Sequence, residues 1–303
     1  MTGAAGFVGQ HVLQCLKDAG YGPSEIVLGA QKADDISATN HECAAFDIAD
    51  AEATAAAIKK IAPTGIVHLA AIAHPGQARA NAPAAWRVNF NGVLHLADAV
   101  MVHAPSARFV FAGSAEAYGL SFAQCGLPIG EAAPLQPMTV YGATKAAADM
   151  ALRQMAFDGL DAVCCRAFNQ TGPGQPADYV VSAFARQIAM IETGRQARRI
   201  SVGNLDAARD FLDVRDIARA YVLALELPLP EARDRALKHS SGRARRIGDI
   251  LEHLIGESGG DNEVVIDPHK LRPNDIKVAS GDNRRAKAIL GWSPEIAFET
   301  TLK

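Results

Sequence analysis

The sequence predicts an α/β protein built on a Rossmann-type, doubly wound parallel sheet, with a smaller α/β lobe at its C-terminal side. Three observations support this. Short apolar runs alternate with longer helical patterns over residues 1–165, three evenly spaced glycines open the chain, and the alternation becomes irregular after a Gly/Pro-rich segment at 171–175. Strands that alternate with helices predict βαβ units and a parallel sheet covered on both faces.

Length and composition narrow the class of protein. The 303 residues exceed the roughly 100–200 residues of a usual domain, so we expect one large domain or two closely joined ones. Hydrophobic residues make up 49% and charged residues 21%, which excludes a disordered, collagen-like or coiled-coil protein. The formal charge of −3 provides no basic excess for nucleic acid or a membrane surface.

Other classes are excluded by what the chain lacks. No apolar run approaches the roughly 20 residues that span a bilayer, and no charged-then-apolar leader opens the sequence, so we expect a soluble, cytoplasmic protein. The five cysteines show no CxxC spacing and the nine histidines are scattered singly. These patterns predict reduced core thiols and no metal site.

The elements are expected in the following order. Strands are predicted at 26–28, 44–46, 65–70, 108–112 and 162–165, with helices near 10–19, 50–62, 82–102 and 141–158 between them. Helices follow at 178–193, 213–227 and 246–257, with strands at 199–202 and 263–267. We assign 1–166, with 205–240 returning to it, to a dinucleotide-binding domain, and 167–204 with 241–303 to a nucleotide-sugar-binding lobe. Ligands of open α/β sheets bind at the carboxyl edge of the strands.

The opening glycines predict a phosphate-binding turn. Gly3, Gly6 and Gly9 lead through Phe7 and Val8 into an amphipathic helical pattern. Such glycines permit a tight turn and a close backbone approach to a pyrophosphate, which the unpaired N–H groups of the helix N-terminus then bind. The turn normally follows a strand, and only Met1 and Thr2 precede Gly3. We therefore expect that several apolar residues of a first strand are missing before Met1.

The next strand end predicts the cofactor. An acidic residue there accepts from a free ribose 2′-hydroxyl, whereas a basic residue accommodates a 2′-phosphate. This strand ends in Leu28-Gly-Ala-Gln-Lys32, with no carboxylate at its tip. Lys32 favours NADP(H), and NAD(H) stays the alternative because a solvated loop lysine would look the same.

A catalytic set is predicted around Tyr141-Gly-Ala-Thr-Lys145. Tyr141 and Lys145 are four residues apart on a helical pattern, hence on one helix face. An ammonium beside a phenol favours phenolate and would lower the tyrosine pKa. Ser114, at the end of an upstream strand, could hold the reacting oxygen against that phenol. This equipment suits proton transfer on a carbonyl or alcohol while a hydride moves on carbon.

With these motifs the chain resembles the extended short-chain dehydrogenases/reductases, which act on nucleotide sugars. The resemblance runs from Thr2 to about Phe298 and includes the segments at 2–9, 46–48, 68–71, 88–92, 113–119 and 141–145. It implies Ser114, Tyr141 and Lys145 as the catalytic triad, and homodimers that pair two helices from each subunit. It also implies a nicotinamide cofactor held by Gly3, Gly6, Phe7, Val8, Gly9, Asp47, Ile48, Leu69, Ala70, Ala71, Asn89, Tyr141 and Lys145.

Within this family the chain is most similar to reductases of GDP-4-keto-6-deoxy-D-mannose. The segments at 168–175, 181–188, 202–216 and 271–273 carry that likeness. By similarity, Asn169, Val180, Arg209 and Arg272 would contact the nucleotide sugar, and guanidinium groups suit its phosphates. Gln170 and the segment 237–242 depart from the reductase pattern, which leaves the exact substrate open.

Three other functions remain. GDP-mannose 4,6-dehydratases need a carboxylate two residues before the tyrosine of a Tyr-Gly pair, and Glu116 stands there before Tyr118-Gly119. Against a dehydratase, no Gln-Asp-Gly follows the glycine turn and no paired arginine occupies 172–174. A 4-epimerase of another nucleotide sugar is the next alternative. A non-catalytic sensor of NADP(H) or nucleotide sugar would not need Ser114, Tyr141 and Lys145 together.

Overall fold

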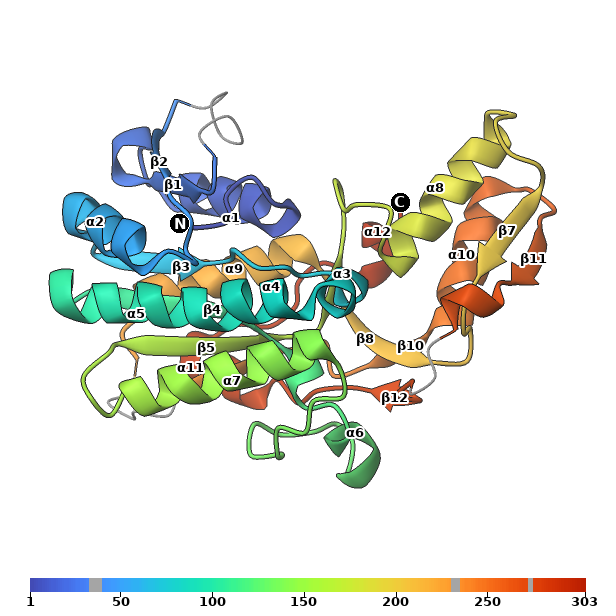
Figure 1. The fold of residues 1–303 in the computed structure, drawn as a ribbon. Coiled ribbons are helices and arrows are strands. Elements are labelled where there is room, and N and C mark those ends of the chain that lie inside the picture. The colour runs from blue at the N-terminus through green and yellow to red at the C-terminus, as the bar shows by residue number, and fades with distance from the viewer. Residues whose placement is uncertain (33–39, 230–234, 272–274) are drawn as a thin grey trace.

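The large sheet is parallel and lies at the centre of the larger lobe. The computed structural model describes residues 1–32, 40–229, 235–271 and 275–303 (Figure 1). Strand β1 (Val27–Ala30) pairs with β2 (Glu42–Ala45), and β3 (Gly65–His68), β4 (Arg108–Ser114), β5 (Ala162–Ala167) and β9 (Ala236–His239) follow in that order. Thr2 forms parallel bridges to Gly29 and to His68, so it joins the β1 and β3 sides into one sheet.

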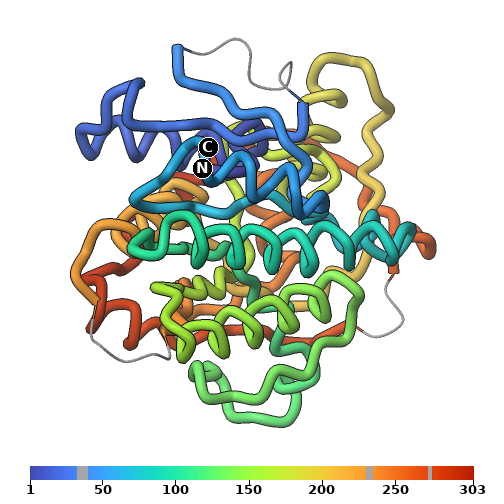
Figure 2. The backbone as a smooth tube through the Cα atoms, turned by 60° about the vertical axis from the view of Figure 1, so that its left-hand side comes forward, coloured from blue at the N-terminus to red at the C-terminus, as the bar shows by residue number. Residues whose placement is uncertain are grey.

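Helices cover both faces of this sheet because its strand residues are apolar on both sides. Helices α1 (Phe7–Asp18) and α9 (Val214–Glu226) share one core with Val67, Val110 and Val163, which are register neighbours on β3, β4 and β5. Helices α2 (Ala51–Ile61), α5 (Gly92–His103) and α7 (Val140–Met155) share another core with the neighbouring register row of Ile66, Phe109 and Ala162. Side chains alternate between the faces of a strand, and Figure 2 shows α2, α5 and α7 side by side.

The stretch predicted as a helix at 82–102 is interrupted in the structure. Helix α4 (Ala82–Trp86) passes into a π-helical turn (Arg87–Asn91) before α5 begins, and a short α3 (Pro75–Ala80) precedes it. Asn89 in this turn is fully buried, and its amide binds both backbone groups of Ile72 and the hydroxyl of Thr144 on α7. Isolated π turns of this kind occur frequently at functional sites.

The smaller lobe has its own apolar core. Helices α8 (Val180–Glu192) and α10 (Ile247–Ser258) pack with β7 (Arg199–Val202), which pairs in parallel with β11 (Glu263–Ile266). Figure 1 shows these four elements beside the large sheet. A second small sheet contains β6 (Asn169–Thr171), β8 (Ala208–Asp213), β10 (Ala244–Arg246) and β12 (Val278–Ala279). Short α6 (Ser121–Gln124), α11 (Arg284–Leu290) and α12 (Phe298–Thr301) complete the fold.

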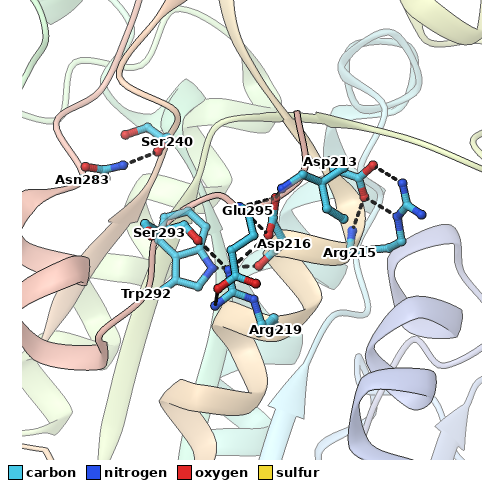
Figure 3. A network of polar contacts seen from close by, with 10 residues as sticks. Asp213, Arg215, Asp216, Arg219, Ser240, Asn283, Trp292, Ser293 and Glu295 are labelled. Atoms are coloured by element: carbon cyan, nitrogen blue, oxygen red, sulfur yellow. Dashed lines mark hydrogen bonds and ion pairs between the residues drawn. The ribbon is translucent and has the colours of Figure 1, made fainter. Parts of the chain in front are cut away.

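A carboxylate at the start of α9 holds the C-terminal segment (Figure 3). Asp216 is 2% exposed and accepts backbone hydrogen bonds from Glu295 and Ile296 at 3.0–3.1 Å. The Trp292 indole donates to the backbone oxygen of Asp216 at 2.8 Å. Asp213, the N-cap of α9, accepts from Arg215 and from Thr301 of α12. The chain that leads to α12 is therefore anchored on the larger lobe.

Candidate active site

The carboxyl edge of the large sheet opens into a cavity of about 840 Å³ that both lobes line. From the larger lobe come the glycine turn, the ends of β1, β3 and β4, and the first turn of α7. From the smaller lobe come β6, the start of α8 and residues of β8 and β12. A cavity of this size at this edge matches the usual ligand position in open α/β folds.

The glycine turn has the geometry that a pyrophosphate requires. Gly3 has φ of +71°, and a Cβ there would lie 2.6 Å from Ala70 N. A Cβ at Gly9 would lie 2.4 Å from the Gly3 carbonyl oxygen, so side chains would separate α1 from the turn. Helix α1 begins after Gly6 with no side-chain cap, which leaves N–H groups at its N-terminus for an anion. These residues fit a dinucleotide.

The end of the cavity beside β1, where adenosine is expected, differs from the expectation at one residue. Asp47 and Ile48 line it, and the Gln31 amide donates to Asp47 at 3.0 Å. Lys32 is exposed and does not contribute to the cavity wall. Lys32 does not line the cavity because the chain turns at Gln31, and the Gln31 side chain faces Asp47 instead.

Ser114 and Tyr141 both line the cavity, where the Ser114 hydroxyl lies close enough to the Tyr141 phenol to lower its pKa. Tyr141 is in the first turn of α7, whose N-cap is Thr139, and Ser114 ends β4. A Cβ at Gly142 would lie 2.6 Å from the Glu116 carbonyl oxygen. The glycine beside Tyr141 thus lets the helix approach the turn after Ser114, which brings the two hydroxyls together.

Lys145 lies one helical turn behind Tyr141 and outside the cavity wall. Its ammonium donates to the Ala112 carbonyl at 2.8 Å and lies 4.7 Å from the centre of the Phe111 ring. The side chain is 3% exposed, and burial lowers the Lys145 pKa to about 7. Asn89 likewise lies behind the wall, where it connects Ile72 to α7.

The pKa of Tyr141 moves against the direction expected from Lys145. Burial raises it well above its ordinary value, the nearby Glu116 carboxylate raises it further, and the Ser114 hydroxyl acts in the opposite sense. The expectation that Lys145 lowers the Tyr141 pKa is therefore wrong, because the Lys145 ammonium donates its hydrogen bond to the Ala112 carbonyl. Tyr141 is therefore a protonated phenol at neutral pH, which suits a proton donor.

The substrate side combines predicted and unpredicted residues. Asn169, Val180 and Arg209 line the cavity, and Arg209 donates to the Asp275 carboxylate and to the Ile276 carbonyl. Arg272 lies outside the described residues. Residues that the sequence motifs did not indicate also line the wall, namely Gln31, His74, Arg87, Gln175, Tyr179 and Asp275. Tyr179 is the N-cap of α8, so its position at the start of the helix predicted at 178–193 was the available signal.

The fold and this constellation define a nicotinamide-dinucleotide enzyme of the extended short-chain dehydrogenase/reductase type. The pairing of a phosphate-binding glycine turn with a Ser–Tyr hydroxyl pair in one cavity supports that class. The chain belongs to the GDP-mannose 4,6 dehydratase family, whose model matches residues 1–303.

Individual relatives span several reactions of this family. The chain is 29% identical over 304 residues to GDP-6-deoxy-D-mannose reductase of Pseudomonas aeruginosa, covering 100% of this chain and 94% of the relative. The structure of RMD from Pseudomonas aeruginosa complexed with NADPH has a TM-score of 0.82 at 28% identity, covering 99% of this chain and 94% of the other. UDP-glucose 4-epimerase of Thermotoga maritima with UDP-glucose has a TM-score of 0.87 at 26% identity, covering 100% and 95%. The protein is thus an NAD(P)-dependent enzyme that modifies nucleotide sugars.

Two further findings concern the described part of the chain. There, no helix combines the length and the apolar character needed to cross a membrane. Nor do His, Cys, Asp and Glu side chains gather in threes where they could hold a metal ion, as far as the described ranges extend.

Proposed function

We propose that this enzyme uses NAD(P)H to reduce the 4-keto group of a nucleotide-activated 6-deoxy sugar, converting GDP-4-keto-6-deoxy-D-mannose to GDP-D-rhamnose. The observation that carries the proposal is the placement of the Tyr141 phenol and the Ser114 hydroxyl in the same cavity that the glycine turn lines. Full-length similarity to a GDP-6-deoxy-D-mannose reductase supports a GDP-linked 6-deoxy sugar as the substrate.

In this mechanism the bound nicotinamide supplies the hydride. Ser114 donates a hydrogen bond to the keto oxygen and holds it beside Tyr141. The Tyr141 phenol then gives its proton to the oxygen as negative charge develops there, which is general acid catalysis. Lys145, buried one turn behind, donates to the Ala112 carbonyl and so holds α7 against β4, the strand that ends at Ser114. Solvent water then reprotonates the Tyr141 phenolate.

The cofactor-binding roles follow the cavity wall. Gly3, Gly6 and Gly9, with the backbone of Phe7 and Val8, would hold the pyrophosphate at the start of α1. Asp47 and Ile48 would border the adenine, and Leu69, Ala70 and Ala71 would follow the dinucleotide toward Tyr141 and Lys145. We favour NADP(H), which the NADPH complex of the RMD relative supports. NAD(H) stays the alternative because Asp47, rather than Lys32, faces this end of the cavity.

The nucleotide sugar would enter from the smaller lobe. Arg209 and Arg272 would bind the diphosphate, because guanidinium groups donate paired hydrogen bonds to phosphate oxygens. Asn169 and Val180 would contact the sugar and the nucleoside. We also propose that Asn169, Val180 and Arg272 belong to a separate substrate lobe, formed by 167–204 and 241–303, and that Arg209 contributes from the dinucleotide domain of 1–166 and 205–240.

Glu116 favours a second candidate, a GDP-mannose 4,6-dehydratase. Its carboxylate lines the cavity and acts electrostatically on Tyr141. A dehydratase needs such a carboxylate to remove the C5 proton during water elimination. The two reactions differ in redox balance, because a dehydratase returns its hydride to the sugar and a reductase consumes external reduced cofactor.

This difference gives the experiment. Purified protein receives GDP-mannose in one reaction, and GDP-4-keto-6-deoxymannose with NADPH or NADH in another. We expect nucleotide oxidation equal to sugar consumption in the second reaction and no change in the first. Formation of a keto sugar from GDP-mannose without added reductant would establish the dehydratase instead. Cofactor binding without turnover of any GDP-, dTDP- or UDP-linked keto sugar would indicate a sensor.

We further propose a homodimer formed through α5 and α7. Large apolar side chains on or beside these helices are exposed, namely Val102 at 71%, Met150 at 60% and Phe157 at 61%. Burying such a surface against a second copy would remove it from water. Replacing Met150 and Phe157 with Glu should yield a monomer in light scattering, and an unchanged mass would refute this interface.

A further inference from the structure

One buried guanidinium contacts three segments around the site without lining the main cavity. Arg166 on β5 is 1% exposed. Its Nε and Nη2 donate to the two carboxylate oxygens of Asp149 at 2.9 and 2.6 Å. Its Nη1 donates to the Tyr118 hydroxyl at 2.7 Å and to the Glu131 carbonyl at 3.1 Å. Four directed hydrogen bonds therefore fix the orientation of this side chain.

Two of the three partners of Arg166, Asp149 and Tyr118, belong to segments that carry a candidate catalytic group. Asp149 lies one turn beyond Lys145 on α7, the helix that also carries Tyr141. Tyr118 is fully buried and closes the short 3₁₀ turn (Ala115–Ala117) that contains Glu116. Arg166 itself is the register partner of Gly113, directly beside Ser114. The guanidinium thus links the helix, the turn and the strand end.

Further charged groups surround this link. Asp149 is 1% exposed and has a second cation, Arg153, at 3.9 Å on its own helix. Arg166 and Lys238 each lie 5.2 Å from the centre of the Tyr118 ring, and Lys238 donates its backbone N–H to the Glu131 carboxylate. Buried ion pairs gain little net stability because desolvation offsets their attraction. Their directional bonds define a geometry instead.

We propose that Arg166 and Asp149 are positioning residues, which set how closely the Tyr141 phenol approaches Ser114 and Glu116. The inference rests on the proposed function for its kinetic readout, because only the reaction reports that approach. Neither residue lines the main cavity, so loss of the pair should change the proton-transfer step and leave ligand contacts intact. Misplacing reacting groups by about 1 Å can cost about 10²-fold in rate.

The test is a set of isosteric variants with a matched control. Asp149→Asn keeps the shape of the side chain and removes its charge. Tyr118→Phe removes only the hydroxyl that accepts the hydrogen bond from Arg166 Nη1. Asp161→Asn is the control, because the Arg108–Asp161 pair, at 3.0 Å, lies where β4 and β5 begin, at the opposite end of these strands from Ser114 and Arg166. We expect kcat to fall by about 10-fold or more in Asp149→Asn, while KM and cofactor affinity stay within about twofold of wild type. The control should keep the wild-type kcat.

A second measurement does not depend on activity. Amide hydrogen exchange in 114–119 should become faster in Asp149→Asn and stay unchanged in Asp161→Asn, since only the first variant releases the turn. Wild-type kcat in both Asp149→Asn and Tyr118→Phe, or an equal loss in the control, would overturn the proposal. If Asp149→Asn does not fold, Tyr118→Phe decides it. If the wild-type protein reduces no keto sugar, the proposed function fails, and the exchange data alone then judge the link.

Discussion

Thr139 Oγ1 donates a hydrogen bond of 3.0 Å to the Glu116 carboxylate. The same hydroxyl accepts from Gly142 N at 2.9 Å and so caps α7. The carboxylate is therefore held at the N-terminus of the helix that carries Tyr141, where the helix dipole favours negative charge. Glu116 and Tyr141 form one electrostatic unit, and the cap keeps them together.

Glu116→Gln should shift the pH dependence of turnover. Burial and the Glu116 carboxylate both raise the Tyr141 pKa, so an amide at 116 should lower it. The reaction needs the protonated phenol, and its alkaline limb should consequently move to lower pH. The measurement is kcat against pH, with Glu131→Gln as a matched control outside the main cavity. An unmoved limb would contradict the coupling, and complete loss of activity would favour the dehydratase.

Tyr141→Phe should reduce turnover by roughly 10²–10⁴-fold, the usual scale of general acid catalysis. The change removes only the hydroxyl, so nucleotide-sugar and cofactor binding should survive. Single-turnover assays with calorimetric binding measurements check both parts. Turnover near the wild-type rate would remove Tyr141 from the mechanism. Tyr179→Phe is a useful comparison, because that phenol lines the same cavity from the smaller lobe.

Lys145→Met should change how stability depends on pH in the cofactor-free protein. Burial lowers the Lys145 pKa to about 7, against about 10.4 in an unfolded chain. Between these values the unfolded state binds a proton that the folded state does not, so the free energy of unfolding rises with pH in that window. Below about pH 7, the folded state carries the buried Lys145 ammonium, and the full destabilisation from burying this charge remains.

The measurement is urea unfolding of both proteins at about pH 6 and about pH 9. Between the two conditions the free energy of unfolding should rise on the order of 2 kcal/mol more in the wild type than in the variant, because each pKa unit contributes about 1.4 kcal/mol. Lys238, whose pKa burial lowers to about 8, titrates in the same window in both proteins and cancels in the difference. Parallel pH profiles would contradict a buried, partly neutral Lys145.

Local periodicity predicts most of the large sheet. The strands near 65, 108 and 162 and the helices near 51 and 140 appear within a few residues of their expected places, because apolar spacing is a property of each segment. The π turn at Arg87–Asn91 is different. It depends on the Asn89 amide reaching Ile72 and Thr144, which are distant in sequence. The same applies to β6, β8, β10 and β12, short strands whose pairing is entirely tertiary.

The candidate site, like the fold, has features that the sequence predicts and features that it does not. Motif spacing predicts that Ser114, Tyr141 and the glycine turn meet at one sheet edge, and they line one cavity. It does not predict which residue at the end of β1 faces the cavity, and Lys32 turns outward while Gln31 binds Asp47. Nor does it predict Tyr179 and Asp275, which line the cavity from the smaller lobe.

Arg209→Lys should weaken binding of the nucleotide sugar and leave cofactor binding unchanged. Arg209 donates to Asp275 and to two backbone carbonyls, and the Asn204 amide holds the other oxygen of Asp275 at 3.0 Å. A guanidinium presents its five donors in a planar fork that matches phosphate oxygens. An ammonium has three donors at one point and cannot reproduce that geometry.

Hydrogen bonds to charged groups contribute about 1.5–3 kcal/mol, so KM for the GDP sugar should rise by about 10–100-fold. Steady-state kinetics with a separate NADPH titration by fluorescence measure the two effects. Arg215→Lys is the control, since Arg215 also pairs with an aspartate, Asp213, and is 46% exposed outside the cavity. A rise in the cofactor dissociation constant with unchanged KM would place Arg209 on the dinucleotide instead. Equal effects in both variants would show that the loss of any arginine–aspartate pair near β8 suffices, and the phosphate role would then be wrong.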